Sequence, residues 1–287
     1  MKYILDHDIH LHSKFSPCSN DARHTVESIL SYGVTNGYRL LVLTDHAWDN
    51  EIDVPHRGWV GAGATWQALK ALAPLPQAKG THFLLGIEVD INMDGVRAID
   101  RQGEDEADFI IYAPSHLHMK HFTIPADFPE DAETHAARYK ERLHDLLNDN
   151  TIPFEKTGLA HFTCSLACTK EPIRVFELFS DAEYRDIFQK VARRGMGVEL
   201  NFDSYGYNGK DLQEILRPYR IAKEVGCKFY CGSDAHHPEN FRGSHRNLCH
   251  IIDMLELQES DKHPFIADRI ARMDAGEQFL GNRKQEA

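Results

Sequence analysis

The sequence predicts an α/β fold of alternating parallel strands and helices, and three observations support this prediction. Short apolar runs typical of buried parallel strands recur along the chain and alternate with segments of helical periodicity. Most of these runs end in a His, Asp or Glu, and the carboxyl ends of parallel strands gather at one face of such folds. The 287 residues are a length that α/β barrels fill as one domain, and no linker divides them, so we expect a single domain over residues 1–287.

Seven runs have the composition of buried strands. The first starts at Tyr3, and the other six cover residues 39–44, 82–91, 109–112, 158–161, 197–201 and 227–232. Helical spacing of apolar residues predicts helices over 22–32, 65–73, 131–148, 181–194, 211–225 and most of the tail from 241. The segments 47–63 and 93–108 lack periodicity, so we expect loops there, the first of them at the active site.

The composition is that of an ordinary soluble protein with an acidic balance. Lys and Arg total 32 against 44 Asp and Glu, and this net charge of −12 argues against a broad basic face for extended nucleic acid. No apolar run approaches the ~18 residues of a membrane span, and the amino terminus lacks a signal-peptide pattern, so we expect a cytoplasmic protein without a membrane partner. The 18 His residues favour a metal site, and the six Cys residues show no zinc-knuckle spacing.

The most informative stretch is the polar sequence at the end of the first strand. Side chains alternate faces along a strand, so Asp8, His10 and His12 point the same way. His7 points to the other side and is expected to pack or to form hydrogen bonds. Two imidazoles two residues apart can bind one cation together when their second nitrogens are held by other groups. Taken alone, the same residues also fit a polar strand at the surface.

The other strand ends supply further groups of the same kind. They carry Asp45 and His46, Glu88, His116 and His118, His161, Glu199 and Asn201, and Asp234 and His236. Glu88 has apolar neighbours on both sides, and a buried carboxylate is costly unless it is paired or bound to a cation. Carboxylates with imidazoles suit Zn²⁺, Mn²⁺ or Fe, and the lack of a Cys₂ or Cys₄ cluster argues against a closed structural zinc site.

This ordered set resembles the PHP family, named for polymerase and histidinol phosphatase domains. The matching pieces are Asp8-x-His10-x-His12-Ser13, Thr44-Asp45-His46, Gly86-Ile87-Glu88, a His after the fourth strand, His161 and Ser233-Asp234-Ala235-His236. They occur in the family's order and cover most of the chain. The resemblance implies a distorted seven-stranded (βα)7 barrel with two or three divalent metal ions at the carboxyl ends of the strands.

The resemblance also implies which residues bind the ions. One set, His10, His12, Glu88 and Asp234, would hold the first ion; Glu88 would bridge to a second held by His116 and His161; His46 and His236 would hold the third. The family usually has an Asp or His where this chain has Cys18. We expect the Cys18 thiolate to be a ligand, with Asp21 as the substitute and an inert buried thiol as the alternative. After the fourth strand, sequence spacing does not distinguish His116 from His118, and we prefer His116 because it lies nearer the strand end.

Several further residues are candidates for binding substrate. Three arginines could each bind a phosphate through two hydrogen bonds: Arg57, Arg242 and Arg246. An Arg in a loop also fits a solvated surface. His237 and His56 are further candidate contacts. Glu199 and Asn201, at the end of the sixth strand, fit a structural role in the barrel mouth as well as a functional one.

These residues predict a metal-dependent phosphatase that hydrolyses a small phosphomonoester by attack of a metal-bridging hydroxide, with Glu88, Asp234 and His236 as catalytic residues. Histidinol phosphate is the substrate that the resemblance names, and a nucleotide monophosphate fits equally well. The alternative is a phosphodiesterase or exonuclease acting on short oligonucleotides or nucleotides. Two further alternatives are an amidohydrolase-type barrel and a non-catalytic metal-binding barrel. The first would have a bridging Lys where this chain has Glu88, and the second would bind metal without hydrolysing a phosphoester. The sequence gives no signal for oligomeric state.

Overall fold

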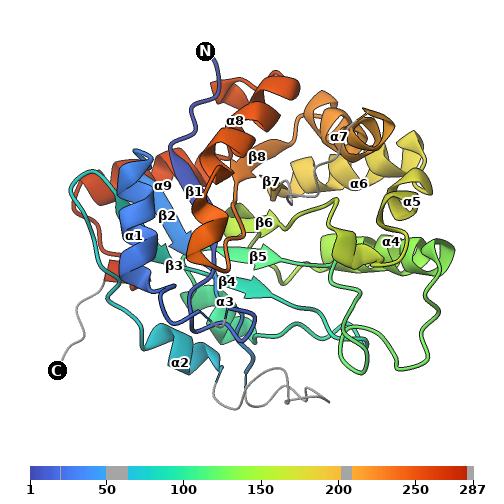
Figure 1. Ribbon diagram of the computed structural model, residues 1–287, viewed down its shortest axis with the longest axis horizontal. Coiled ribbons are helices and arrows are strands. Elements are labelled where there is room, and N and C mark those ends of the chain that lie inside the picture. Colours follow the sequence, from blue (N-terminus) through green and yellow to red (C-terminus); the bar gives the residue numbers. More distant parts are fainter. Residues whose placement is uncertain (20, 50–63, 202–208, 283–287) are drawn as a thin grey trace.

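The strands of this protein run parallel in two sheets (Figure 1). The computed structural model describes residues 1–19, 21–49, 64–201 and 209–282. In that part of the chain the first sheet has the order β1-β2-β3 and the second the order β4-β5-β6-β7-β8. The strands are β1 (His7–Leu11), β2 (Leu40–Leu43), β3 (His82–Leu85), β4 (Ile87–Val89), β5 (Ile110–Tyr112), β6 (Thr157–Leu159), β7 (Gly197–Leu200) and β8 (Lys228–Cys231).

The parallel α/β arrangement agrees with the prediction, but the described strands form two sheets and not one seven-stranded barrel, because the predicted strand over 82–91 is two strands that belong to different sheets. β3 pairs with β2, whereas β4 pairs with β5, and Gly86 lies between them. The Gly86 amide donates to the carbonyl of Leu43 (2.7 Å), and the next amide donates to that of Phe109 (3.1 Å). A Cβ at position 86 would collide with the Phe109 carbonyl and lie 2.8 Å from Cγ1 of Val42. Only glycine fits where the chain crosses between the sheets.

Isolated bridges join the two sheets where their strands end. His46, after β2, bridges to Glu88 in β4, and Leu11, at the end of β1, bridges to Ala235 after β8. The amide of Asp234 also donates to the carbonyl of His10 at 2.9 Å. The carboxyl ends of strands from both sheets therefore meet in one place.

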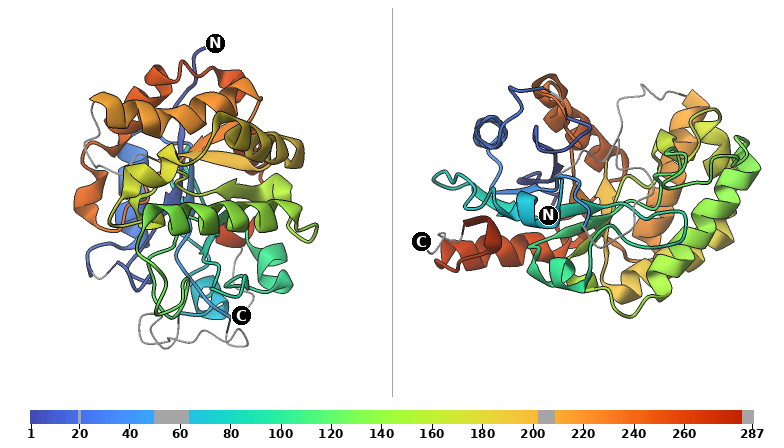
Figure 2. Two further views of the ribbon diagram at one scale, coloured as in Figure 1. Left: turned by 90° about the vertical axis from the view of Figure 1, so that its right-hand side faces the viewer. Right: turned by 90° about the horizontal axis from the view of Figure 1, so that it is seen from below.

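Helices cover the strands on the outside (Figures 1 and 2). The helices are α1 (Val26–Thr35), α2 (Trp66–Lys70), α3 (Arg101–Glu106), α4 (Ala132–Asn148), α5 (Pro172–Glu177), α6 (Asp181–Arg194), α7 (Gly209–Glu224), α8 (Ser244–Met254) and α9 (Pro264–Asp274). Single 3₁₀ turns are η1 (Phe154–Lys156), η2 (Ser165–Ala167), η3 (Pro238–Phe241), η4 (Glu259–Asp261) and η5 (Leu280–Asn282). No helix in these described ranges is long and apolar enough to cross a membrane.

Local capping signals fix the helix ends. The Asp131 side chain accepts a hydrogen bond from the amide of Thr134 (2.7 Å) and begins α4, and Ser180 and Glu183 form a capping box that begins α6. These helices agree with the predictions over 131–148 and 181–194. α3 lies inside the predicted loop 93–108, because Asp100 caps it by accepting from the amide of Gly103. α5 lies where no element was predicted.

The carboxyl-terminal segment closes the opposite side of the strands from the site. Asp274 at the end of α9 pairs with Arg39 and His82, which stand at the amino ends of β2 and β3. Phe265 and Ile266 of α9 join an apolar cluster with side chains of the inner strands, namely Ile9, Leu40, Val42, Leu84, Phe109, Ile111 and Tyr230. Because α9 covers the amino ends of the strands, the carboxyl ends form the open face.

Candidate metal centre

The carboxyl ends of the strands bring the predicted metal ligands together in three overlapping groups. The groups are His10, His12, Glu88 and Asp234; Glu88, His116 and His161; and His12, Cys18, His46 and His236. Within each group the potential ligand atoms all lie within 4.8 Å of one another. Glu88 belongs to the first two groups, and His12 belongs to the first and the third.

Glu88 lies at the centre, and its two oxygens face different sets of imidazoles. Oε2 lies 3.1 to 3.2 Å from the Nε2 atoms of His10, His12 and His46. Oε1 lies 3.1 Å from Nε2 of His161 and 3.8 Å from Nε2 of His116. The carboxylate is 1% exposed, as expected for a bridging group between two buried sites.

Asp234 completes the first group from a strained backbone position. Its Oδ1 atom lies 3.1 Å from Nε2 of His12 and 3.4 Å from Nε2 of His10. Its φ of 51° lies in the left-handed region, which a residue other than glycine adopts at an energetic cost. Such strain is typical of functional sites.

The second nitrogen of each imidazole in the three groups faces a polar atom, and all but that of His46 are within hydrogen-bond distance of it. Glu199 Oε1 lies 2.6 Å from Nδ1 of His10, and the hydroxyls of Ser16 and Ser115 lie 3.1 Å and 2.9 Å from Nδ1 of His12 and His161. Asp90 faces two rings, with Oδ1 2.8 Å from Nδ1 of His116 and Oδ2 3.4 Å from Nδ1 of His46. Nδ1 of His236 lies 2.8 Å from the carbonyl oxygen of Asp234. If each Nδ1 carries the proton, each Nε2 lone pair is free for a cation.

The spacing of the Nε2 and carboxylate atoms fits a metal ion. Four ligands at about 2.0 Å from a tetrahedral ion are about 3.3 Å apart. The first group has ligand pairs 3.1 to 3.4 Å apart, as this geometry requires. Imidazoles with carboxylates are a donor set suited to Zn²⁺, Mn²⁺ or Fe.

The side chains of the site form a tightly paired cluster of buried charges. Burial disfavours the charged form of His10, yet Glu199, Glu88 and Asp234 raise its pKa well above the ordinary value. Burial likewise disfavours the Glu88 carboxylate, but His46 and His10 hold its pKa well below the ordinary value. The charges of His10, His46 and Glu88 therefore stabilise one another in the buried site.

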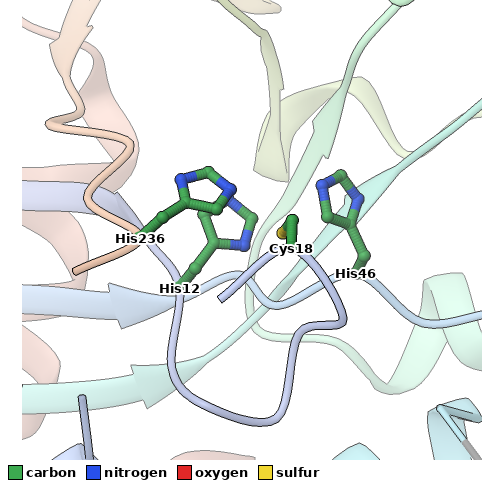
Figure 3. A group of neighbouring side chains, drawn as sticks. All are labelled: His12, Cys18, His46 and His236. Atoms are coloured by element: carbon green, nitrogen blue, oxygen red, sulfur yellow. The ribbon is translucent and has the colours of Figure 1, made fainter. Parts of the chain in front are cut away.

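The third group contains a thiol, and Figure 3 shows the Cys18 side chain between the rings of His46 and His236. Although burial raises the pKa of the Cys18 thiol, hydrogen bonds to His236 and His46 lower it to about 5. The His12 ring stacks on the His236 ring with 4.2 Å between centroids. Asp21, the alternative, instead binds the guanidinium of Arg23 (3.0 Å) and lies outside the three groups.

His116 and not His118 faces Glu88, in line with the preference for the His nearer the strand end. His118 lies beyond it, with ring centroids 5.4 Å apart, and burial and the nearby His116 lower the pKa of His118 to about 4. Arg142 of α4 positions the His116 loop by donating to the carbonyl of His116 at 3.1 Å.

Asp8, expected to share an edge with His10 and His12, is not part of any of the three groups. It accepts hydrogen bonds from the hydroxyl of Tyr32 (3.0 Å) and the amide of Ser233 (2.9 Å), and burial raises its pKa to about 6. The pairing of β1 with β2 is irregular between Asp8 and Leu11. His7 is buried and hydrogen-bonded to Asp6 and to the amide of Cys231, as predicted.

Two carboxylates act on the site in ways that the sequence did not reveal. Glu199 holds His10 and also accepts from the amide of His161, and Asp90 holds His116 and His46. The sequence does contain a pattern that points to them. Like Glu88, each is an acidic residue inside or just after an apolar strand, and Asp90 lies on the same strand face as Glu88.

A cavity of about 380 Å³ opens beside the centre and is lined by His161, Asp234 and His236 and, on the far wall, by Arg242 and residues of α8. The predicted contact His237 does not line it; its backbone amide donates to Asn240 instead. Arg246 does not line the cavity either. Arg57 and His56, with most of the predicted loop 47–63, lie outside the described residues.

Comparison with known proteins finds a likeness of fold. No family model matches the sequence, so membership of the PHP family stays a prediction, and no curated protein matches it. Among solved structures, the histidinol phosphate phosphatase of Lactococcus lactis subsp. lactis Il1403, complexed with zinc, L-histidinol and phosphate, is similar with a TM-score of 0.54. The sequences are 14% identical, and the match covers 90% of this chain and 98% of that chain. This chain therefore shares its fold with a zinc-containing enzyme over nearly its whole length.

Proposed function

We propose that this protein is a metal-dependent phosphoesterase that hydrolyses a small phosphomonoester with two or three bound divalent ions of zinc, manganese or iron. The observation that carries the proposal is the arrangement around Glu88. Imidazole Nε2 atoms face both of its carboxylate oxygens, and the Nδ1 atoms of His10, His12, His116 and His161 have hydrogen-bond partners. The fold supports it, because the similar phosphatase was solved with zinc and phosphate.

The three groups divide the ligands as follows. The first ion would be held by His10, His12, Glu88 and Asp234, the second by Glu88, His116 and His161, and the third by Cys18, His46 and His236 with His12 beside it. Bound divalent ions would neutralise phosphoryl oxygens and promote ionisation of water near neutral pH. Glu88, Asp234 and His236 would act in catalysis by fixing the positions of these ions.

The cavity favours a small substrate over extended nucleic acid. Its volume of about 380 Å³ is within the range of small-molecule sites. Arg242 is the only Lys or Arg among its lining residues in the described part of the chain, and it would bind the phosphate. A histidinol-phosphate-like compound or a nucleotide monophosphate fits these limits, whereas a nucleic acid strand calls for several cations.

The test is metal content followed by phosphate release from a panel of phosphomonoesters, a diester and short oligonucleotides. We expect two to three metal ions per chain and release from monoesters. Metal with cleavage of only the diester or the oligonucleotides would contradict the phosphatase assignment.

The substitution Glu88→Gln should abolish both metal binding and hydrolysis, because an amide cannot bridge two cations. The matched control is Glu104→Gln, which also removes a buried carboxylate but one paired with Arg97 outside the site. The control should lose stability and keep its metal. A Glu88→Gln protein with full metal content and full activity would contradict the assignment of the centre.

A further inference from the structure

The cavity beside the metal centre has one wall of strand ends and one wall of helix. Asn201 follows β7, and Ser233 follows β8, the neighbouring strand; both residues line the cavity next to Asp234 and His236. The opposite wall comes from η3 and α8 and includes Arg242 and the apolar side chains of Leu248 and Ile251. A ligand in the cavity would contact the metal centre at one end and this mixed wall at the other.

Three polar atoms on the strand-end wall are buried without a hydrogen-bond partner in the structure as described: Nδ2 of Asn201, Oγ of Ser233 and Oδ1 of Asp234. Asp234 Oδ1 belongs to the first metal group, and the Ser233 hydroxyl interacts with Asp8, whose pKa it lowers, so Nδ2 of Asn201 is the donor left without any partner. Asn201 is only 7% exposed, so water does not replace the missing partner freely. Unpaired buried donors are rare in native proteins, and a ligand is one of the few explanations for them. Here Asn201 Nδ2 lies at the end of β7, and the Ser233 hydroxyl lies on the adjacent strand end of the same cavity.

The chemistry of these atoms limits what can satisfy them. An amide N–H can only donate a hydrogen bond, and a hydroxyl can donate as well, so the matching group on a ligand is an acceptor oxygen. Phosphoryl oxygens are strong, charged acceptors, and they would lie close to Asp234 and His236 in the proposed reaction.

We propose that Asn201 and Ser233 bind an acceptor oxygen of the phosphoryl group and so position the substrate against the metal centre. This inference rests on the proposed function and adds two substrate-binding residues to it. Arg242 holds the phosphate from the other wall, and Leu248 and Ile251 contact the organic part. The substrate is then a small phosphomonoester with an apolar face.

The experiment measures binding of inorganic phosphate to the zinc-loaded protein by isothermal titration calorimetry, with zinc content and the unfolding midpoint recorded for every variant. Asn201→Leu and Ser233→Ala each remove one donor, and Asn201→Asp puts a repelling charge of the same shape in its place. The matched control is Asn247→Asp, which adds the same charge on the exposed α8 wall of the cavity.

We expect Asn201→Leu to weaken phosphate binding about 10- to 100-fold, the value of one hydrogen bond to a charged acceptor. Asn201→Asp should weaken it further, and Asn247→Asp should change it far less. Zinc content should stay unchanged, and the midpoint of Asn201→Leu should change little, because the loss of Nδ2 breaks no hydrogen bond. Ser233→Ala should act in the same direction.

Two results would overturn the inference while the proposed function stands: parental phosphate affinity in both Asn201 variants, or affinity lost together with zinc and stability. The second would show that Asn201 is structural. A parental protein that carries zinc but neither binds phosphate nor hydrolyses any monoester would overturn the proposed function and the inference with it.

Discussion

His236, in the third group of ligands, binds a proton more tightly than an ordinary imidazole. Burial disfavours the charged form of His236, but Asp234 and Cys18 raise its pKa to about 9. A proton on such a ring and a metal ion exclude each other, so acid must release the metal. The raised pKa extends this competition above neutral pH.

We therefore predict that zinc affinity continues to rise between pH 7 and pH 9. Imidazoles with the ordinary pKa of about 6.5 would be deprotonated by pH 7.5, and affinity would level off there. The measurement is competition with a chromogenic chelator from pH 6 to pH 9, corrected for the chelator's own protonation. A flat affinity above pH 7.5 would show that His236 is not among the ligands or is not charged in the free protein.

Cys18 gives the third group a soft ligand that the other two groups lack. A thiolate favours zinc and cobalt over magnesium and manganese, and the low pKa of Cys18 means that the thiolate is present at neutral pH. Asp at this position would supply a hard oxygen ligand instead.

The prediction is that cobalt-loaded protein shows a thiolate-to-metal charge-transfer band in the near ultraviolet, and that Cys18→Asp and Cys18→Ser abolish it. Cys18→Asp should also bind manganese in the third site more tightly than the parent does. Cys249→Ser is the control, because Cys249 is also half-buried beside an imidazole, with Sγ 3.6 Å from Nε2 of His245, but lies outside the three groups. A band that survives in Cys18→Asp would exclude Cys18 as a ligand.

At the scale of the elements, Gly86 decides which sheet each half of the broken strand joins. It stands two residues before Glu88, so its backbone path sets the place of the central carboxylate.

Gly86→Ala should destabilise the protein by about 1–3 kcal/mol, the usual cost of overpacking a core position, because the methyl group meets the Phe109 carbonyl. It should also lower zinc affinity by displacing Glu88. Gly103→Ala is the contrasting variant: Gly103 lies in α3, its added methyl would meet neighbours at 3.4 Å, and the change should be neutral or stabilise by about 0.5–1 kcal/mol. Urea unfolding compares the two, and equal stability of Gly86→Ala and the parent would contradict this account.

The sequence predicts most elements because their signals are local. Capping residues and apolar spacing locate α4 and α6, and apolar runs locate the strands. The break at Gly86 is not a local signal, since a glycine inside an apolar run also fits a continuous strand. It depends on the neighbours Val42 and Phe109, which come from other strands.

At the scale of the whole molecule, the grouping of ligands follows from the parallel fold, because residues at strand ends must meet there. The carboxylates that hydrogen-bond to those ligands cannot be predicted from the parallel fold in this way. Glu199 reaches His10 across 189 positions of sequence, and Asp90 serves two rings from different strands. Such contacts depend on register and side-chain direction, which spacing within one strand does not contain.

Two of the three groups take ligands from both sheets. His10 and His12 come from the first sheet and Glu88 and Asp234 from the second, and Cys18 and His46 lie on the first side opposite His236. Metal removal should therefore lower the unfolding midpoint of the whole protein. Saturating zinc at about 100 times the dissociation constant should add about 2.7 kcal/mol per site, measured by calorimetry with and without chelator. Glu88→Gln should show little of this shift, and an equal shift in that variant would place the stabilising zinc elsewhere.

An ion bound between His12 and Asp234 would have a second role, because it would cross-link two distant parts of the chain. His12 lies near one end of the sequence and Asp234 near the other, so one ion at this point joins the ends of a loop that contains most of the protein. Long loops are those whose closure restricts an unfolded chain the most. In this protein a bound ion would then also stabilise the fold by restricting the unfolded chain.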